Sequence, residues 1–71
     1  MFKAKDLSDK NPTLTASALP FATIYSLEDL LKDKFSIRVP CTFYHKGIEL
    51  EKDQTYEFYA IQDEDTIEYK L

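Results

Sequence analysis

Cys41 and His45 are the only cysteine and the only histidine in this chain of 71 residues. A disulfide within the chain is therefore impossible, and no Cys/His cluster exists to hold a structural metal. A domain of this size buries only about 60% of the surface that its unfolded chain exposes, so its stability margin is small. The hydrophobic core must supply the stability alone. The composition permits this, because 44% of the residues are hydrophobic and they include five Phe and five Tyr.

Charge is distributed unevenly along the chain. Nine Lys and Arg against thirteen Asp and Glu give a net charge of −4. Residues 47–71 carry two basic and eight acidic groups, a net −6, whereas residues 1–46 carry seven basic and five acidic groups, a net +2. An acidic chain does not neutralise phosphates, so we expect no nucleic-acid partner. The acidic part is either a solvated face or a surface for a basic partner.

The sequence offers no segment that would cross or enter a membrane. Its longest apolar run is about four residues, far short of a membrane span. The N-terminus lacks the basic and then apolar pattern of a signal peptide. Together with the single cysteine, this predicts a reducing compartment, the cytoplasm or the nucleus.

Two alternating stretches near the N-terminus predict a β-hairpin. Residues 2–6 and residues 13–18 each alternate between the two faces of a strand, and turn-forming residues at 8–12 separate them. The expected inward side chains are Phe2, Ala4 and Asp6 in the first strand and Leu14, Ala16 and Ala18 in the second. Because those of the second strand are small, a bulkier group must fill the space beneath them.

A helical period begins after Pro20, which cannot donate a ladder hydrogen bond and so ends the second strand. The apolar positions at i, i+3 and i+7 are Ile24, Leu27 and Leu31. This stripe predicts a helix of about ten to twelve residues that closes near Phe35. Either Thr23 or Ser26 is expected to cap its start, the second with Asp29 three residues on.

The second half of the chain predicts three further strands, over residues 41–45, 48–50 and 66–71. Gly47, the only glycine, lies in the turn between the first two, where we expect a positive φ. Thr55 is expected to cap a single helical turn over residues 56–59. The resulting element order is ββαββ, a short helix and β. It predicts one α+β domain, residues 1–71, in which one helix packs on a mixed four- or five-stranded sheet.

This order, with these residues, resembles the ubiquitin family and its β-grasp fold. The resemblance covers essentially the whole chain and is strongest in the second half. The segments that carry it are Phe43–Leu50 (FYHKGIEL), Asp53-Gln54-Thr55, Tyr59–Gln62 (YAIQ) and Thr66-Ile67. Pro20 and Thr23-Ile24 match the start of the family's helix, whereas the first hairpin has a longer turn and matches less well. In the family, the residue at Tyr59 anchors the preceding loop through its hydroxyl.

The resemblance also implies a partner-binding patch on the sheet. Its aliphatic members in ubiquitin correspond here to Leu7, Tyr44 and Lys70, and the histidine beside them corresponds to Glu68. One aliphatic position has therefore become aromatic and another charged. The position of a linkage lysine in ubiquitin chains is Ile48, so chain building there is excluded.

Tyr44, His45 and Ile48 flank one tight turn, with Lys70 on the neighbouring strand. An exposed Tyr and Ile together could form a binding hot spot. The alternative is that they are isolated apolar residues of an ordinary surface.

Other candidate sites are weak. Cys41 and His45 lie four residues apart on one strand, about 13 Å at about 3.3 Å per residue, too far for a nucleophilic pair. We expect a buried, inert thiol at Cys41 and a solvated turn at Asp63-Glu64-Asp65. Phe58 is either core or part of a second aromatic patch beside Tyr56. We expect no enzyme activity, no cofactor and no metal.

The sequence therefore predicts a non-catalytic ubiquitin-like interaction domain, part of a larger protein. Its expected partner is a ubiquitin receptor or a proteasome subunit, and the domain itself is expected to be a monomer. The printed sequence has no Gly-Gly tail after its last strand, as conjugated relatives have, so we expect that it is not a modifier. Two alternatives remain: a modifier trimmed before that tail, and a stand-alone tailless scaffold subunit, for example in RNA processing.

Overall fold

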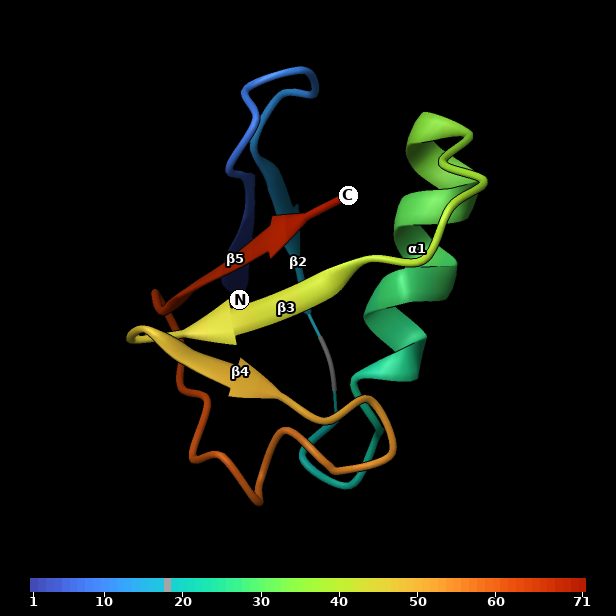
Figure 1. The fold of residues 1–71 in the computed structure, drawn as a ribbon. Coiled ribbons are helices and arrows are strands. Elements are labelled where there is room, and N and C mark those ends of the chain that lie inside the picture. The colour runs from blue at the N-terminus through green and yellow to red at the C-terminus, as the bar shows by residue number, and fades with distance from the viewer. Residues whose placement is uncertain (18) are drawn as a thin grey trace.

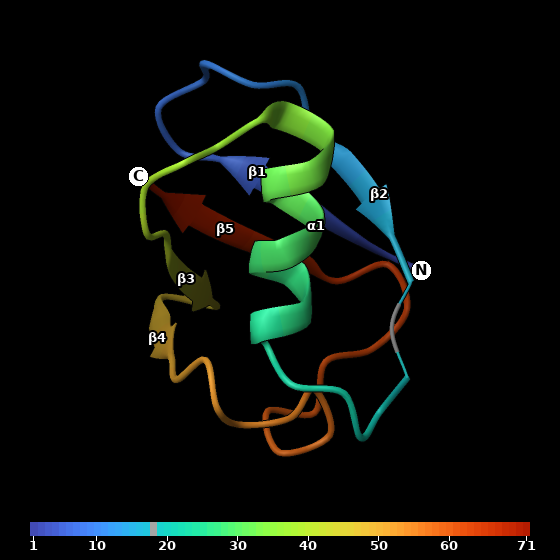
Figure 2. The same ribbon diagram turned by 90° about the vertical axis from the view of Figure 1, so that its right-hand side faces the viewer.

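The protein is an α+β domain in which one helix packs on a five-stranded mixed sheet. The structure is a computed structural model that describes residues 1–17 and 19–71. Its elements are β1 (Phe2–Asp6), β2 (Leu14–Ala16), α1 (Tyr25–Phe35), β3 (Thr42–His45), β4 (Ile48–Leu50) and β5 (Thr66–Lys70). Figures 1 and 2 show α1 lying across one face of the sheet. The predicted fold class is confirmed at this level.

The first and last strands form the centre of the sheet. The strand order is β2-β1-β5-β3-β4. β1 pairs with β5 in parallel, and the other three pairs are antiparallel. The predicted hairpin is therefore confirmed as the β1–β2 pair, and β2 and β4 form the two edges.

The predicted strand bounds hold for β1 and β4 and are too long for the other three. β3 begins at Thr42 rather than at Cys41. β2 covers three residues rather than 13–18, because its register with β1 ends at the Ala4–Leu14 pair; Ala18 lies outside the described residues. β5 ends at Lys70, whose partner Thr42 is the first residue of β3. Leu71, which the predicted strand included, therefore has no β3 residue beside it and is 43% exposed.

Two aromatic rings lie beside the small Ala16 side chain of β2, and with it they line a hollow of about 300 Å³. The Phe2 and Tyr56 rings lie 5.3 Å apart, centroid to centroid, and both residues are buried. The rest of the core joins the helical stripe to the inward residues of the sheet. Its further members are Ala4, Ala16, Ile24, Leu27, Leu31, Ile37, Cys41, Phe43, Leu50, Ile67 and Tyr69.

The start of α1 is capped by backbone rather than by either predicted side chain. Ser26 lies inside the helix, and its Oγ donates to the Thr23 carbonyl at 2.7 Å. The Ile24 and Tyr25 N–H groups donate to the carbonyls of Gln54 and Lys52, at 2.9 and 3.0 Å. The predicted side-chain cap is therefore wrong for both residues, because Ser26 lies inside the helix and no side chain caps its first turn among the described residues.

The chain between β4 and β5 forms a turn closed by backbone hydrogen bonds, rather than the predicted single helical turn. The Phe58 N–H donates to Thr55 Oγ1 at 3.0 Å, so the predicted capping contact is present. The turn closes at Ala60, whose φ of 54° is left-handed. The Tyr59 hydroxyl accepts a hydrogen bond from the Glu51 N–H at 2.7 Å, as the resemblance implied.

Among the described residues, no helix is long and apolar enough to cross a membrane.

Candidate functional site

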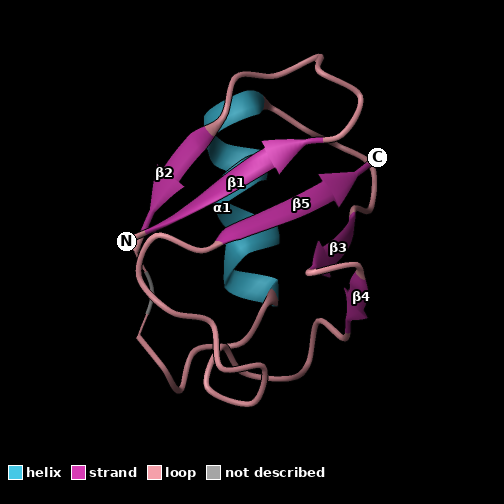
Figure 3. Ribbon diagram, turned by 90° about the vertical axis from the view of Figure 1, so that its left-hand side faces the viewer, coloured by secondary structure: helices cyan, strands magenta, loops and turns pink. Residues whose placement is uncertain are grey.

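One face of the sheet is free of the helix, as Figure 3 shows with α1 behind the strands. Side chains alternate between the two faces of a strand, and directly paired residues share a face. The burial pattern places Phe2, Ala4, Phe43 and Ile67 on the helix side. The opposite set, here named the open face, is Lys3, Lys5, Thr15, Thr42, Tyr44, Glu49, Thr66, Glu68 and Lys70.

Tyr44 lies in the middle of a row that crosses the open face. Lys5 pairs with Glu68, Glu68 pairs with Tyr44, and Tyr44 pairs with Glu49. Directly opposite residues in such pairs have Cβ atoms about 5 Å apart. The partly exposed aromatic ring therefore stands between two carboxylates. This row can offer a partner an apolar contact flanked by acceptors for its Arg or Lys side chains.

Leu7 and Lys70 lie together at one end of the open face. The Leu7 N–H donates to the Tyr69 carbonyl at 2.9 Å, one residue past the Asp6–Tyr69 pair, so Leu7 continues β1 beside the end of β5. Leu7 is 43% exposed, and Lys70 is also exposed. The structure thus brings Leu7, Tyr44, Glu68 and Lys70 onto one side of the sheet.

His45 and Ile48 do not belong to this face. They pair with each other across the β3–β4 turn, and that turn has the predicted positive φ at Gly47, 79°. Both lie on the helix side, where Ile48 is 64% exposed at the sheet edge and His45 only 8%. The expectation that Tyr44 and Ile48 form one patch is therefore wrong, because adjacent residues in a strand point to opposite faces and Ile48 shares the face of His45.

His45 has a structural partner that the sequence did not indicate. Its Nε2 lies 3.2 Å from Asp65 Oδ2, and that same oxygen accepts a hydrogen bond from the Gln62 N–H at 2.9 Å. The Gln62 N–H, with a smaller effect of His45, holds the pKa of Asp65 below its usual 3.8. The turn at residues 63–65 is therefore not merely solvated: Asp65 ties it to β3, and Asp63 pairs with the Met1 amine at 2.7 Å.

Cys41 is buried, as expected. Burial and then the nearby Glu28 charge raise the pKa of its thiol. Because the thiolate is the reactive form, a raised pKa makes this thiol a poor nucleophile at neutral pH. Cys41 and His45 also contact different residues, Val39 and Asp65.

Glu28 is a buried carboxylate in the first turn of α1. It accepts a hydrogen bond from Lys52 Nζ at 2.5 Å and another from the Cys41 N–H at 3.2 Å, and Lys32 Nζ lies 3.8 Å away. Burial alone would raise its pKa, but the two hydrogen bonds and the Lys charges lower it below the usual 4.5. This cluster joins α1 to the segments that flank β3 and β4.

Asp6 is a second buried carboxylate, at the end of β1. It accepts hydrogen bonds from the N–H and Oγ of Ser8, at 2.8 and 2.6 Å, and from the N–H and Nδ2 of Asn11, at 3.1 and 3.0 Å. Burial opposes ionisation, yet these four bonds lower the pKa of Asp6 below its usual 3.8. The carboxylate thus organises the loop between β1 and β2, which explains why an acidic residue occupies an inward position.

These shifts predict loss of stability in acid. A carboxyl group with a lowered pKa in the folded state stabilises it fully above the unfolded pKa, and that contribution is lost as the pH falls through the folded pKa. With usual values of 4.5 for Glu28 and 3.8 for Asp6, the free energy of unfolding should be level from neutral pH to about pH 5 and fall below about 4.5. Urea denaturation at a series of pH values measures it. A free energy that rises below pH 4.5 would contradict this.

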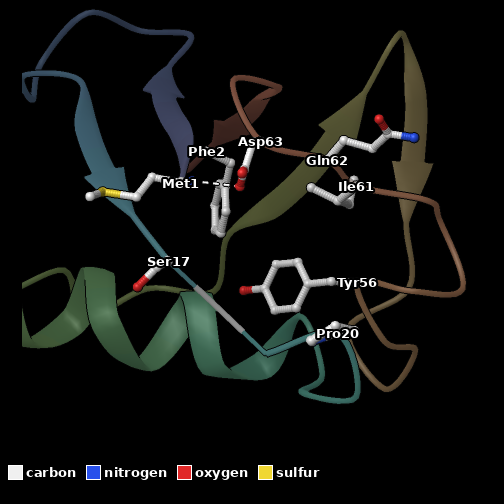
Figure 4. Close-up of a pocket in the computed structure, with 8 residues that line it drawn as sticks. All are labelled: Met1, Phe2, Ser17, Pro20, Tyr56, Ile61, Gln62 and Asp63. Carbon is white, nitrogen blue, oxygen red and sulfur yellow. Dashed lines mark hydrogen bonds and ion pairs between the residues drawn. The ribbon is translucent and has the colours of Figure 1, made fainter.

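A small hollow lies between the start of the chain and the Tyr56 turn (Figure 4). Its volume is about 180 Å³, and its lining includes the Phe2 and Tyr56 rings and the Met1–Asp63 ion pair. Among the described residues that line it, Asp63 is the one carboxylate, and it is paired with the Met1 amine at 2.7 Å.

Within residues 1–17 and 19–71, no group of three or more His, Cys, Asp or Glu side chains is arranged to hold a metal ion. In comparisons with known proteins, the sequence matches no family model and no curated protein.

Proposed function

We propose that the chain is a non-catalytic ubiquitin-like domain that binds a protein partner of the ubiquitin–proteasome system through its open face. The strand order β2-β1-β5-β3-β4, with parallel central strands and one helix on a single face, is compatible with a small β-grasp-like fold and supports the proposal. The observation that carries it is the Lys5–Glu68–Tyr44–Glu49 row on the uncovered side of the sheet.

The aromatic and charged side chains of the open face favour other partner side chains than an aliphatic patch would. Tyr44 supplies a rigid apolar surface at a low entropic cost. Glu49 favours a partner that places Arg or Lys over it, whereas Glu68 already has Lys5 directly opposite in β1. A receptor adapted to a purely aliphatic patch should bind this face more weakly.

A titration of the isotope-labelled chain with a purified proteasomal ubiquitin-receptor subunit, followed by NMR, tests the proposal. We expect amide shifts in β3 and β5, and Tyr44→Ala should weaken binding by about tenfold, because truncated aromatic anchors often cost this much. Ile48→Ala is the matched control, since Ile48 is exposed but lies on the other side of the sheet. Equal losses from Tyr44→Ala and Ile48→Ala would rule out the open face as the binding surface.

A further inference from the structure

Two exposed aromatic rings lie at the end of the molecule where α1 begins. Phe21 is 71% exposed and Phe58 is 64% exposed. Figures 1 and 2 show the loops that carry them side by side below the start of the helix. The Glu57 N–H donates to the Pro20 carbonyl at 2.9 Å, so a backbone hydrogen bond joins the immediate neighbours of the two rings.

The Phe58 side chain is held in place although it is exposed. Its ring packs edge-on against the Tyr59 ring at 5.0 Å, and its N–H is bonded to Thr55. The Tyr59 hydroxyl is in turn anchored by the Glu51 N–H. Phe58 thus stands beside Tyr59, not beside the buried Tyr56. Ordered apolar rings left in water are typical of contact surfaces, because covering them is favourable.

The loop that carries Phe58 is acidic. Glu51, Asp53 and Glu57 are all exposed on the Phe58 loop, and among the described residues none of the three has an ion-pair partner. The only basic residue of that loop, Lys52, is engaged by the buried Glu28. The Phe21 side adds no charge of either sign, because residues 11–27 contain no charged residue.

We propose that this loop-end surface, made of Phe21, Phe58, Glu51, Asp53 and Glu57, binds a basic amphipathic segment of a partner protein. Apolar side chains of the segment cover the two rings, and its Lys or Arg side chains meet the three carboxylates. The charge decides between occupants. Nucleic acid and anionic lipid would be repelled, and a second copy of the chain would bring the same three carboxylates into the contact.

The loop-end surface and the open face have no residue in common. The proposal therefore does not depend on the function proposed for the open face. A domain with both surfaces can contact two partners at once.

A synthetic amphipathic helical peptide made of Leu and Lys is the probe, and a Leu/Glu peptide of the same length is its control. In an NMR titration of the whole chain, we expect the Leu/Lys peptide to shift the amides of residues 20–22 and 55–59. The double variant Phe21→Ser, Phe58→Ser should weaken binding about tenfold or more. Glu57→Lys should weaken it too and reduce its salt dependence.

Val39→Ser is the matched control for the lost apolar surface, since Val39 is 50% exposed elsewhere on the molecule. It should bind the Leu/Lys peptide like the parent chain. All the substituted side chains are exposed, so the variants are expected to fold, and their amide spectra verify this. Equal binding of the two peptides, equal loss in Val39→Ser, or shifts confined to the open face would each overturn the proposal. Sedimentation could also overturn it. If the parent chain is a dimer and the double variant is a monomer, the surface binds a second copy of the chain.

Discussion

Replacing Glu28 by Ala should lower the free energy of unfolding by about 3 kcal/mol. The carboxylate is 7% exposed and holds both Lys52 Nζ and the Cys41 N–H. Without it, a partly buried ammonium group and a buried N–H group lose their acceptor. A domain of this length has a total stability of about 4–10 kcal/mol, so the loss is a large share of it.

Urea denaturation at neutral pH measures this loss. Glu28→Gln should cost less, because the amide oxygen can still accept one hydrogen bond. Lys32→Ala is the control: its ammonium lies 3.8 Å from Glu28 and its side chain is 48% exposed, so we expect a change below about 0.5 kcal/mol. If Glu28→Ala is as mild as Lys32→Ala, the cluster does not fasten α1 to the sheet.

A double-mutant cycle separates the ion pair from the backbone hydrogen bond. If the ion pair with Lys52 dominates, the double variant Glu28→Ala, Lys52→Ala should lose little more stability than Lys52→Ala alone. If the bond to the Cys41 N–H dominates, the two losses should add.

Replacing Asp6 by Ala should cost about 2 kcal/mol and loosen the β1–β2 loop. The carboxylate is 1% exposed and accepts four hydrogen bonds from Ser8 and Asn11. The loss of these bonds exceeds the relief from removing a buried charge, since their effect on its pKa already outweighs that of burial. Asp6→Ala should therefore lower the stability of the whole domain and also reduce the order of the β1–β2 loop.

Hydrogen exchange distinguishes the local part. The Ser8 and Asn11 amides should exchange faster in Asp6→Ala by a larger factor than those of β3. Asp9→Asn is the control: Asp9 is exposed in the same loop with a φ of 58°, and Asn tolerates this left-handed conformation. Unchanged exchange at Ser8 and Asn11 in Asp6→Ala would show that the loop keeps its order without the carboxylate.

The secondary structure could be predicted because each element carries its own period. The alternation of β1 and the stripe of α1 depend only on residues within each element. Contacts between distant segments could not be predicted in this way. The carbonyls that cap α1 come from Lys52 and Gln54, more than 25 residues along the chain, and no local pattern indicates them.

The candidate site shows the same division. The resemblance grouped Leu7, Tyr44, Glu68 and Lys70, and the strand pairing places all four on one side of the sheet. The grouping of Tyr44 with Ile48 relied on closeness in sequence, although Ile48 pairs with His45 and shares its face. Glu28 was missed for a related reason, because a charged residue beside a helical stripe usually faces water and its partner Lys52 is 24 residues away.

The parallel pairing of β1 with β5 has a consequence for synthesis. A chain that emerges from the ribosome N-terminus first can form the β1–β2 hairpin and α1 early, but the centre of its sheet stays open until Thr66–Lys70 has emerged. Until then β1 has a free edge, and the core residues Ile67 and Tyr69 are missing. Such contacts between the ends of a chain slow folding and prolong exposure to aggregation. This domain therefore gains its cooperative stability at the last step, when the final strand fills the central place in the sheet.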